Sequence, residues 1–246
     1  MRTRHPLRHR LAAGLTAGLA TLLLAGCGGD DSDEAAGSSS SAGASSAESS
    51  ASEQTGPEVA AAAADALEEA GAVRVAGTMG SGTEAQTIDL FLQGEDVTGS
   101  ITVSGQIVQL LTVGGMSYLQ AGADFWTSAG VPADAVGQVA DMWVVVPAEE
   151  AESFGEITLA SLVEELRSPS DGAFDDEVGS DTIDGTDVQV LTQAASTIYV
   201  AAEDPMYPLR VEDTGADAGT LDLSEFGETR TLTAPQNPLD LTQLGA

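Results

Sequence analysis

The chain has 246 residues, with 39 acidic residues against eight basic ones, no lysine and a single cysteine. Beyond Cys27 only four arginines remain, so the net charge there is 4 − 39, about −35. This balance excludes the basic face that nucleic-acid binding needs. Both histidines lie before Cys27, which excludes Ser-His-Asp catalysis, Cys-His catalysis and zinc sites built from His and Cys in the rest of the chain. The absence of lysine excludes a Schiff base, and the single cysteine excludes an internal disulfide. We expect no enzyme, no cofactor, no metal site and no nucleic-acid partner.

The N-terminus has the pattern of a secretory signal. Four arginines within the first ten residues precede an apolar run over residues 11–24. The run is shorter than the roughly 20 apolar residues of a membrane-spanning helix. Its end, Leu24-Ala25-Gly26-Cys27, resembles the lipobox of bacterial lipoproteins. That resemblance implies lipid transfer to the Cys27 thiol and removal of residues 1–26.

Acyl chains at Cys27, such as palmitate, would hold the protein on the outer face of the cell membrane. Residues 27–56 follow as a lipidated cysteine and a tether of Gly, Ser, Ala and acidic residues. A segment of this composition cannot bury enough apolar surface to offset the entropy of ordering, so it is expected to be disordered. Residues 57–246 are long enough for one domain with a substantial core, which we expect to be monomeric.

The domain is predicted to start with a helix and continue with strands. Thr55 and Glu58 have capping-box spacing, and an alanine-rich stripe then recurs at helical intervals up to Gly71. Alternating apolar residues separated by glycine-marked turns predict an antiparallel meander. Its expected strands lie at 72–76, 88–93, 100–104, 107–113 and 116–120.

The middle of the chain predicts two helices with a short strand between them. Val136, Val139, Ala140 and Trp143 fall on one helical face. A second stripe over residues 159–166 follows Thr158, a candidate N-cap. The short strand is expected at 144–146. Strands are then expected at 188–192, 197–200, 209–211, 220–223 and 229–233. The order of elements predicts an α+β fold with one long antiparallel sheet and helices on one face.

The late strands resemble the LppX/LprG family of actinobacterial lipoproteins, whose members share a LolA-like half-barrel. The resemblance rests on Tyr199-Val200-Ala201, Pro208-Leu209-Arg210-Val211, the stretch Leu221 to Glu228, and Ala234-Pro235. Where the family often has Phe before the serine of the third motif, this chain has Leu223. The resemblance implies helices packed on the concave face of the sheet around an apolar cavity that carries an acylated lipid or glycolipid.

On this hypothesis acyl chains would lie between one sheet face and the two central helices. The candidate cavity residues are Leu90, Leu92, Ile101, Val103, Val136, Val139, Leu159, Leu162, Val163 and Leu166. Two alternatives stay open. The same residues would fill an ordinary core if the protein were an envelope interaction or sensor module without a lipid ligand. An acid-catalysed hydrolase would need two carboxyl groups about 5–9.5 Å apart in a cleft.

Overall fold

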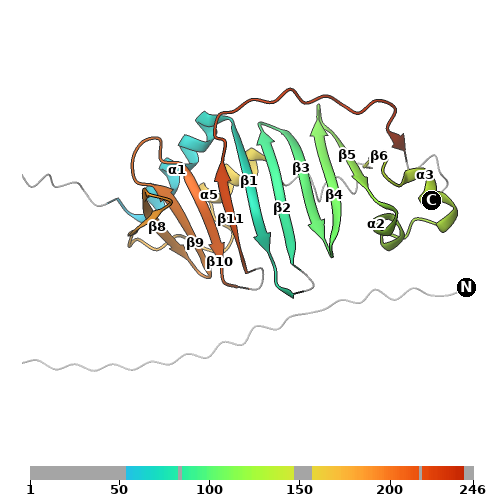
Figure 1. Cartoon of the computed structure of the whole chain (residues 1–246). Helices are drawn as coiled ribbons and strands as arrows, with labels where there is room; N and C mark the ends of the chain where they lie inside the picture. Colours follow the sequence, from blue (N-terminus) through green and yellow to red (C-terminus); the bar gives the residue numbers. More distant parts are fainter. Residues whose placement is uncertain (1–53, 83–84, 147–156, 216–217, 241–246) are drawn as a thin grey trace, which may run out of the picture. The chain divides into compact units, whose positions relative to one another are not determined.

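The computed structural model describes residues 54–82, 85–146, 157–215 and 218–240 (Figure 1). The described residues all belong to one compact unit. The predicted lipid anchor at Cys27 and nearly all of the predicted tether therefore lie outside the described residues. In the part of the chain that is described, no helix is long and apolar enough to span a membrane.

The described elements alternate between runs of strands and short groups of helices. In chain order they are α1 Gly56–Ala70, β1 Ala72–Met79, β2 Gln86–Gln93, β3 Asp96–Val103, β4 Gln106–Val113, β5 Met116–Ala121, α2 Ala123–Ser128, α3 Ala133–Val139, β6 Trp143–Val145, α5 Leu159–Arg167, β7 Gly179–Ile183, β8 Thr186–Gln193, β9 Ser196–Ala201, β10 Pro208–Asp213, β11 Gly219–Ser224 and β12 Leu239–Asp240.

All the strands belong to one sheet, which confirms the predicted α+β class. The 12 strands are ordered β12-β6-β5-β4-β3-β2-β1-β11-β10-β9-β8-β7. Every neighbouring pair is antiparallel except β12 with β6. The sheet is open, with β12 at one edge and β7 at the other. Pairing of β1 with β11 joins the early meander to the late one.

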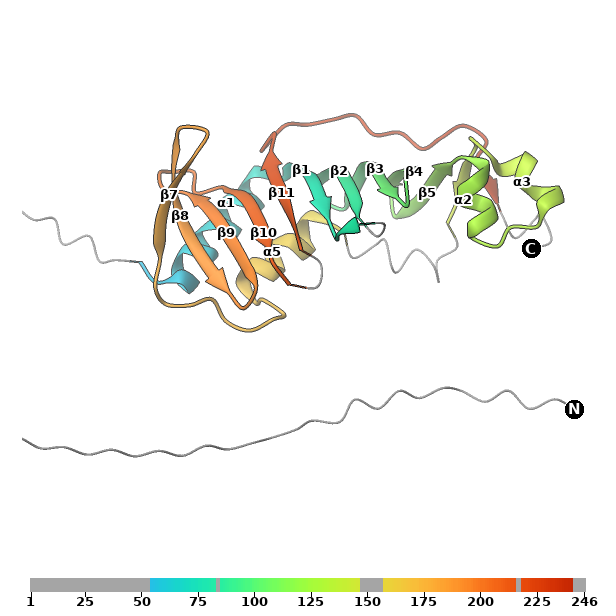
Figure 2. The same ribbon diagram turned by 60° about the horizontal axis from the view of Figure 1, so that its bottom comes forward.

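Helix α1 begins and ends where the sequence predicts. The Thr55 backbone N–H donates to Glu58 Oε2 at 2.8 Å, as in a capping box. Gly71 has a φ of 69° and donates its N–H to the Leu67 carbonyl at 3.2 Å, which ends the helix. α1 contacts α5, β1, β8 and β9. The two helices lie on the concave face of the β7–β11 part of the sheet (Figure 2).

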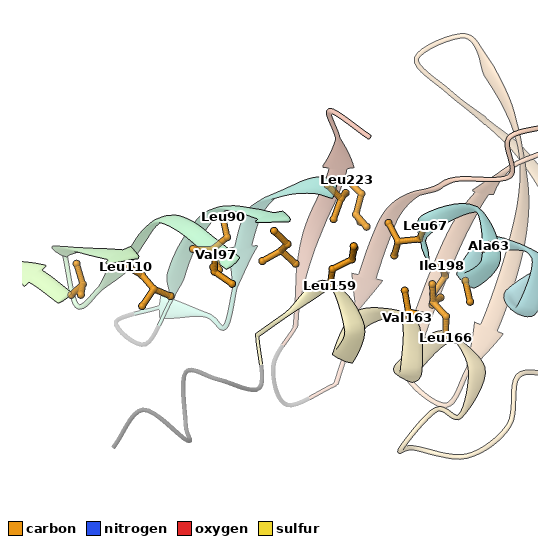
Figure 3. Packing of buried hydrophobic residues seen from close by; sticks show 14 of the residues in the cluster. Ala63, Leu67, Leu90, Val97, Leu110, Leu159, Val163, Leu166, Ile198 and Leu223 are labelled. Atoms are coloured by element: carbon orange, nitrogen blue, oxygen red, sulfur yellow. The ribbon is translucent and has the colours of Figure 1, made fainter. Parts of the chain in front are cut away.

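The core continues from these helices along the inner face of β1–β5. Directly opposed residues in a sheet point to the same face. The register aligns Val75 with Leu90, Leu90 with Gly99, Gly99 with Leu110, and Leu110 with Leu119. These residues therefore form one row across five strands, which we call the inner row. Leu90 and Leu110 are 2% and 1% exposed, and they join the helix residues in one apolar cluster (Figure 3).

Gly99 lets neighbouring strands approach closely. A Cβ at this position would lie 2.1 Å from the Asp89 carbonyl oxygen, and its φ of 148° disfavours L-residues. Gly77 in β1 also leaves no room for a side chain, because a Cβ there would lie 2.0 Å from the Thr220 carbonyl oxygen. Glycines inside strands typically mark sharp bends of a sheet.

The segment 225–238 runs past β1–β5 and ends in β12 beside β6 (Figure 1). The predicted strand at 229–233 is wrong, because this stretch joins no ladder. Instead the Arg230 N–H donates to Gln93 Oε1 at 2.7 Å, and Gln93 Nε2 donates to the Arg230 carbonyl at 3.3 Å. A side-chain amide thus takes the place of a strand partner. The Arg230 guanidinium lies 3.9 Å from the centre of the Phe91 ring.

Three further differences separate the structure from the sequence-based elements. The middle helix α3 ends at Val139, and Trp143 starts strand β6 instead of continuing the helical face. Helix α2 was not predicted, and its buried Trp126 donates its indole N–H to the Ala121 carbonyl at 3.0 Å. Strand β7 was missed because its residues are mostly exposed and show no apolar alternation.

Candidate functional site

The sheet residues predicted to contact acyl chains share the inner face. Leu90 and Leu92 are both 2% exposed, and Ile101 packs against the core cluster while partly buried. Val103, at the end of β3, is 37% exposed and lies outside that cluster. Three of the four residues therefore belong to the continuous apolar face, and Val103 marks its rim.

The predicted residues of α5 pack toward α1 and the late strands. Leu159, Val163 and Leu166 are buried, and Figure 3 shows them facing Leu67 of α1, Ile198 of β9 and Leu223 of β11. Leu162 is partly buried at the edge of this cluster. The Thr158 hydroxyl accepts the Ser161 N–H at 3.1 Å and holds the first turn of α5. The predicted N-cap is confirmed.

The two central helices are not neighbours. Val136 and Val139 lie on α3, which contacts α2 at the β5–β6 end of the sheet, whereas α5 lies with α1 under the late strands (Figures 1 and 2). The sheet face with Leu90, Leu92 and Ile101 lies between them. The structure thus separates the ten predicted residues into a central sheet surface and two flanking helices.

Two surface grooves are formed by other residues, which the sequence reasoning missed. One has a volume of about 630 Å³ and lies between α1 and residues 204–207. The other has a volume of about 560 Å³ and is lined by Gln54, Asp176, Glu177, Val178 and Gln189. The candidate acyl-chain residues line neither groove. Both grooves combine segments far apart in sequence, so periodicity within one segment gave no signal for them.

Each arginine beyond Cys27 is paired with carboxylates on the domain surface. Arg74 donates from Nε and an Nη to the two carboxylate oxygens of Asp89, both at 2.8 Å. This hydrogen bonding lowers the pKa of Asp89 below its ordinary value. Arg167 binds Asp65 and Glu68, Arg210 binds Asp222, and Arg230 binds Glu225. All four arginines in the described part of the chain therefore have a carboxylate partner.

The carboxylates do not assemble into a metal centre within the described ranges. There, no group of three or more Asp, Glu, His or Cys side chains is placed to hold a metal ion. The pKa of Glu58 is lowered by its hydrogen bonds from Thr55, and that of Asp89 by Arg74. A general acid needs a raised pKa, so neither group suits that role.

No protein-family model matches the chain, and no curated protein matches its sequence. Solved structures do match. The lipoprotein LprF from Mycobacterium bovis is 13% identical at a TM-score of 0.49, covering 74% of this chain and 99% of that one. The lipoprotein LppX from Mycobacterium tuberculosis is 16% identical at a TM-score of 0.46, covering 72% and 99%. A DUF1329 family protein from Desulfovibrio piger is 10% identical at a TM-score of 0.29, covering 72% and 93%.

The matching structures thus include LppX, which belongs to the family that the late strands resemble. Identities of 13% and 16% leave ligand and activity to be argued from this chain's own residues.

Proposed function

We propose that this protein is a lipoprotein anchored by Cys27 to the outer face of the cell membrane, and that its sheet binds an acyl chain of a lipid or glycolipid. The inner row carries this proposal. Val75, Leu90, Leu110 and Leu119 lie in register across five strands, with Gly99 between the two central leucines. Figure 3 shows Leu90, Val97 and Leu110 on the same side of the sheet as α5, beyond the N-terminal end of that helix.

The inner row has the dimensions and chemistry for a long hydrocarbon chain. Strands lie about 4.8 Å apart, so five strands span roughly 19 Å. Each CH₂ removed from water contributes about 0.8 kcal/mol, so an acyl chain needs apolar contact far more than hydrogen bonds. Gly99 contributes no side chain to the middle of the row, and the backbones of β2 and β3 approach closely there.

The burial of Leu90 and Leu92 favours the alternative function. Side chains only 2% exposed are already covered in the structure, as in a filled core. In that case the protein would be an envelope interaction or sensor module, and its partner surface would lie elsewhere. The two functions differ in whether an acyl chain can replace the side chains that now cover the inner face.

The test compares two tryptophan substitutions on opposite faces of the sheet. Ile101 is partly buried on the inner face, opposite Ile88 and Val108. Ile107 is 59% exposed and points to the other face, so Ile107→Trp is a matched control. The chain from residue 27 to 246, with Cys27→Ser, is purified from an actinobacterial host and its bound lipids are measured by native mass spectrometry.

We expect the parent chain and Ile107→Trp to retain an acylated lipid, and Ile101→Trp to lose it with little change in the urea midpoint. In a filled core, Ile101→Trp forces overpacking that costs typically about 1–3 kcal/mol. A lower midpoint for Ile101→Trp, together with a parent chain free of lipid, would reject lipid binding and support the interaction module.

A further inference from the structure

The groove between α1 and residues 204–207 has an apolar floor. Its volume is about 630 Å³. The alanines Ala62, Ala66 and Ala70 recur every four residues, so they follow one face of α1. Met206 and Tyr207 form the opposite wall. The core residues Ala63 and Leu67, which are 0% exposed, lie on a different face of α1.

The opposite wall is held in place before any partner binds. The ring of Tyr207 stacks on Phe226 with the centroids 4.1 Å apart and the planes within 4°. The Tyr207 N–H donates to the Pro205 carbonyl at 2.8 Å, and the Tyr207 carbonyl accepts the Ala201 N–H at 2.9 Å. A preformed wall reduces the entropy lost on binding.

Carboxylates surround the apolar floor. Asp65, Glu69 and Asp204 all line the groove. Asp65 is bound by Arg167. Glu69 and Asp204 are exposed, and their carboxylates make no hydrogen bond or ion pair with another described residue. The groove therefore offers two unneutralised negative charges beside an apolar surface.

Beyond Cys27, the chain has no unpaired cationic side chain that could bind the carboxylates of Glu69 and Asp204. It contains no lysine, and its arginines Arg74, Arg167, Arg210 and Arg230 are all paired. Beyond Cys27, the residues outside the description include no Lys, Arg or His. Neither another segment of this chain nor a second copy matches the groove in charge, and anionic lipid headgroups would be repelled.

We propose that this groove is a docking site for a basic amphipathic segment of another protein. Apolar side chains of the segment would contact the alanine face and Tyr207, and its lysines or arginines would pair with Glu69 and Asp204. Opposite charges across a surface speed association and select the partner more than they add affinity. The site is separate from the inner row, so it does not depend on lipid binding.

The test measures binding of a fluorescein-labelled peptide of alternating lysine and leucine, twelve residues long, to the chain 27–246 with Cys27→Ser. Fluorescence anisotropy is read at 150 mM NaCl. The double variant Glu69→Gln with Asp204→Asn removes the groove charges. Glu95→Gln with Asp134→Asn removes two exposed charges elsewhere and serves as its control. Ala66→Trp fills the groove at a half-buried position without changing charge.

We expect the Kd to rise roughly five- to tenfold in the charge variant and in Ala66→Trp, and to stay unchanged in the control. Circular dichroism melts check that all variants fold. The proposal is rejected if the parent chain does not bind the peptide. It is also rejected if the control loses as much affinity as the charge variant, because the peptide would then be responding to the overall negative charge.

Discussion

At the residue scale, the arginines at 74, 167 and 210 join neighbouring strands or helices by surface ion pairs, and Arg230 pairs with Glu225 in its own segment. The Arg74–Asp89 pair is the most regular, because the guanidinium and the carboxylate share two parallel hydrogen bonds between β1 and β2. Asp89 is half exposed, so solvent screening limits the contribution of this pair to about 0.3–1 kcal/mol.

Asp89→Asn is expected to lower the unfolding free energy at pH 7 by that amount, and this effect is expected to shrink as Asp89 becomes protonated in the folded state. The hydrogen bond from Arg74 lowers the pKa of Asp89 below its ordinary 3.8. A lowered pKa stabilises the fold above the ordinary value, and the stabilisation disappears as the pH falls through the folded-state pKa. Urea unfolding of both proteins across this range measures the difference. A difference that stays the same from pH 7 through the acid range would assign the loss to packing.

At the element scale, the curvature of the sheet depends on glycines that allow strands to approach. Gly99 combines a φ of 148° with a Cβ position blocked by the backbone of β2. The same residue leaves the middle of the inner row without a side chain. Gly99 therefore affects both the curvature of the sheet and the candidate acyl-chain surface.

Gly99→Ala is expected to destabilise the domain by about 2 kcal/mol or more, since an unfavourable backbone conformation alone costs about 1–3 kcal/mol. Gly137→Ala is the matched control, because Gly137 lies in helix α3 with open space around its Cβ position. Alanine there should stabilise the helix by up to about 1 kcal/mol. Thermal and urea unfolding report both changes. Equal stability of the two variants would show that β2 and β3 tolerate a wider separation.

At the scale of the whole molecule, an acidic domain is expected to be tied to a membrane through one cysteine. The net charge of about −35 beyond Cys27 opposes contact with anionic lipids, so the anchor must supply the attachment. We propose different partners for the groove beside α1 and for the inner row. The first suits a cationic protein segment and the second an acyl chain.

Cys27→Ser is expected to abolish incorporation of an alkyne-labelled fatty acid and to leave the precursor at its full mass. The thiolate is the group that accepts the lipid, and the chain has no other cysteine. Metabolic labelling followed by membrane fractionation measures both effects. Ser128→Ala, a substitution at an exposed residue of α2, is the control and should be labelled like the parent. Labelling equal to that of the parent would place the lipid on another residue.

Local patterns in the sequence determined much of the fold. The capping box at Thr55, the stop at Gly71 and the alternation along β1–β5 depend on residues within a few positions of each other. Tertiary structure decided the rest. The segment at 229–233 looks like a strand, but its backbone bonds to Gln93, 137 positions away in sequence from Arg230. The separation of α3 from α5, and the groove between α1 and Tyr207, likewise arise from contacts that only the folded sheet brings together.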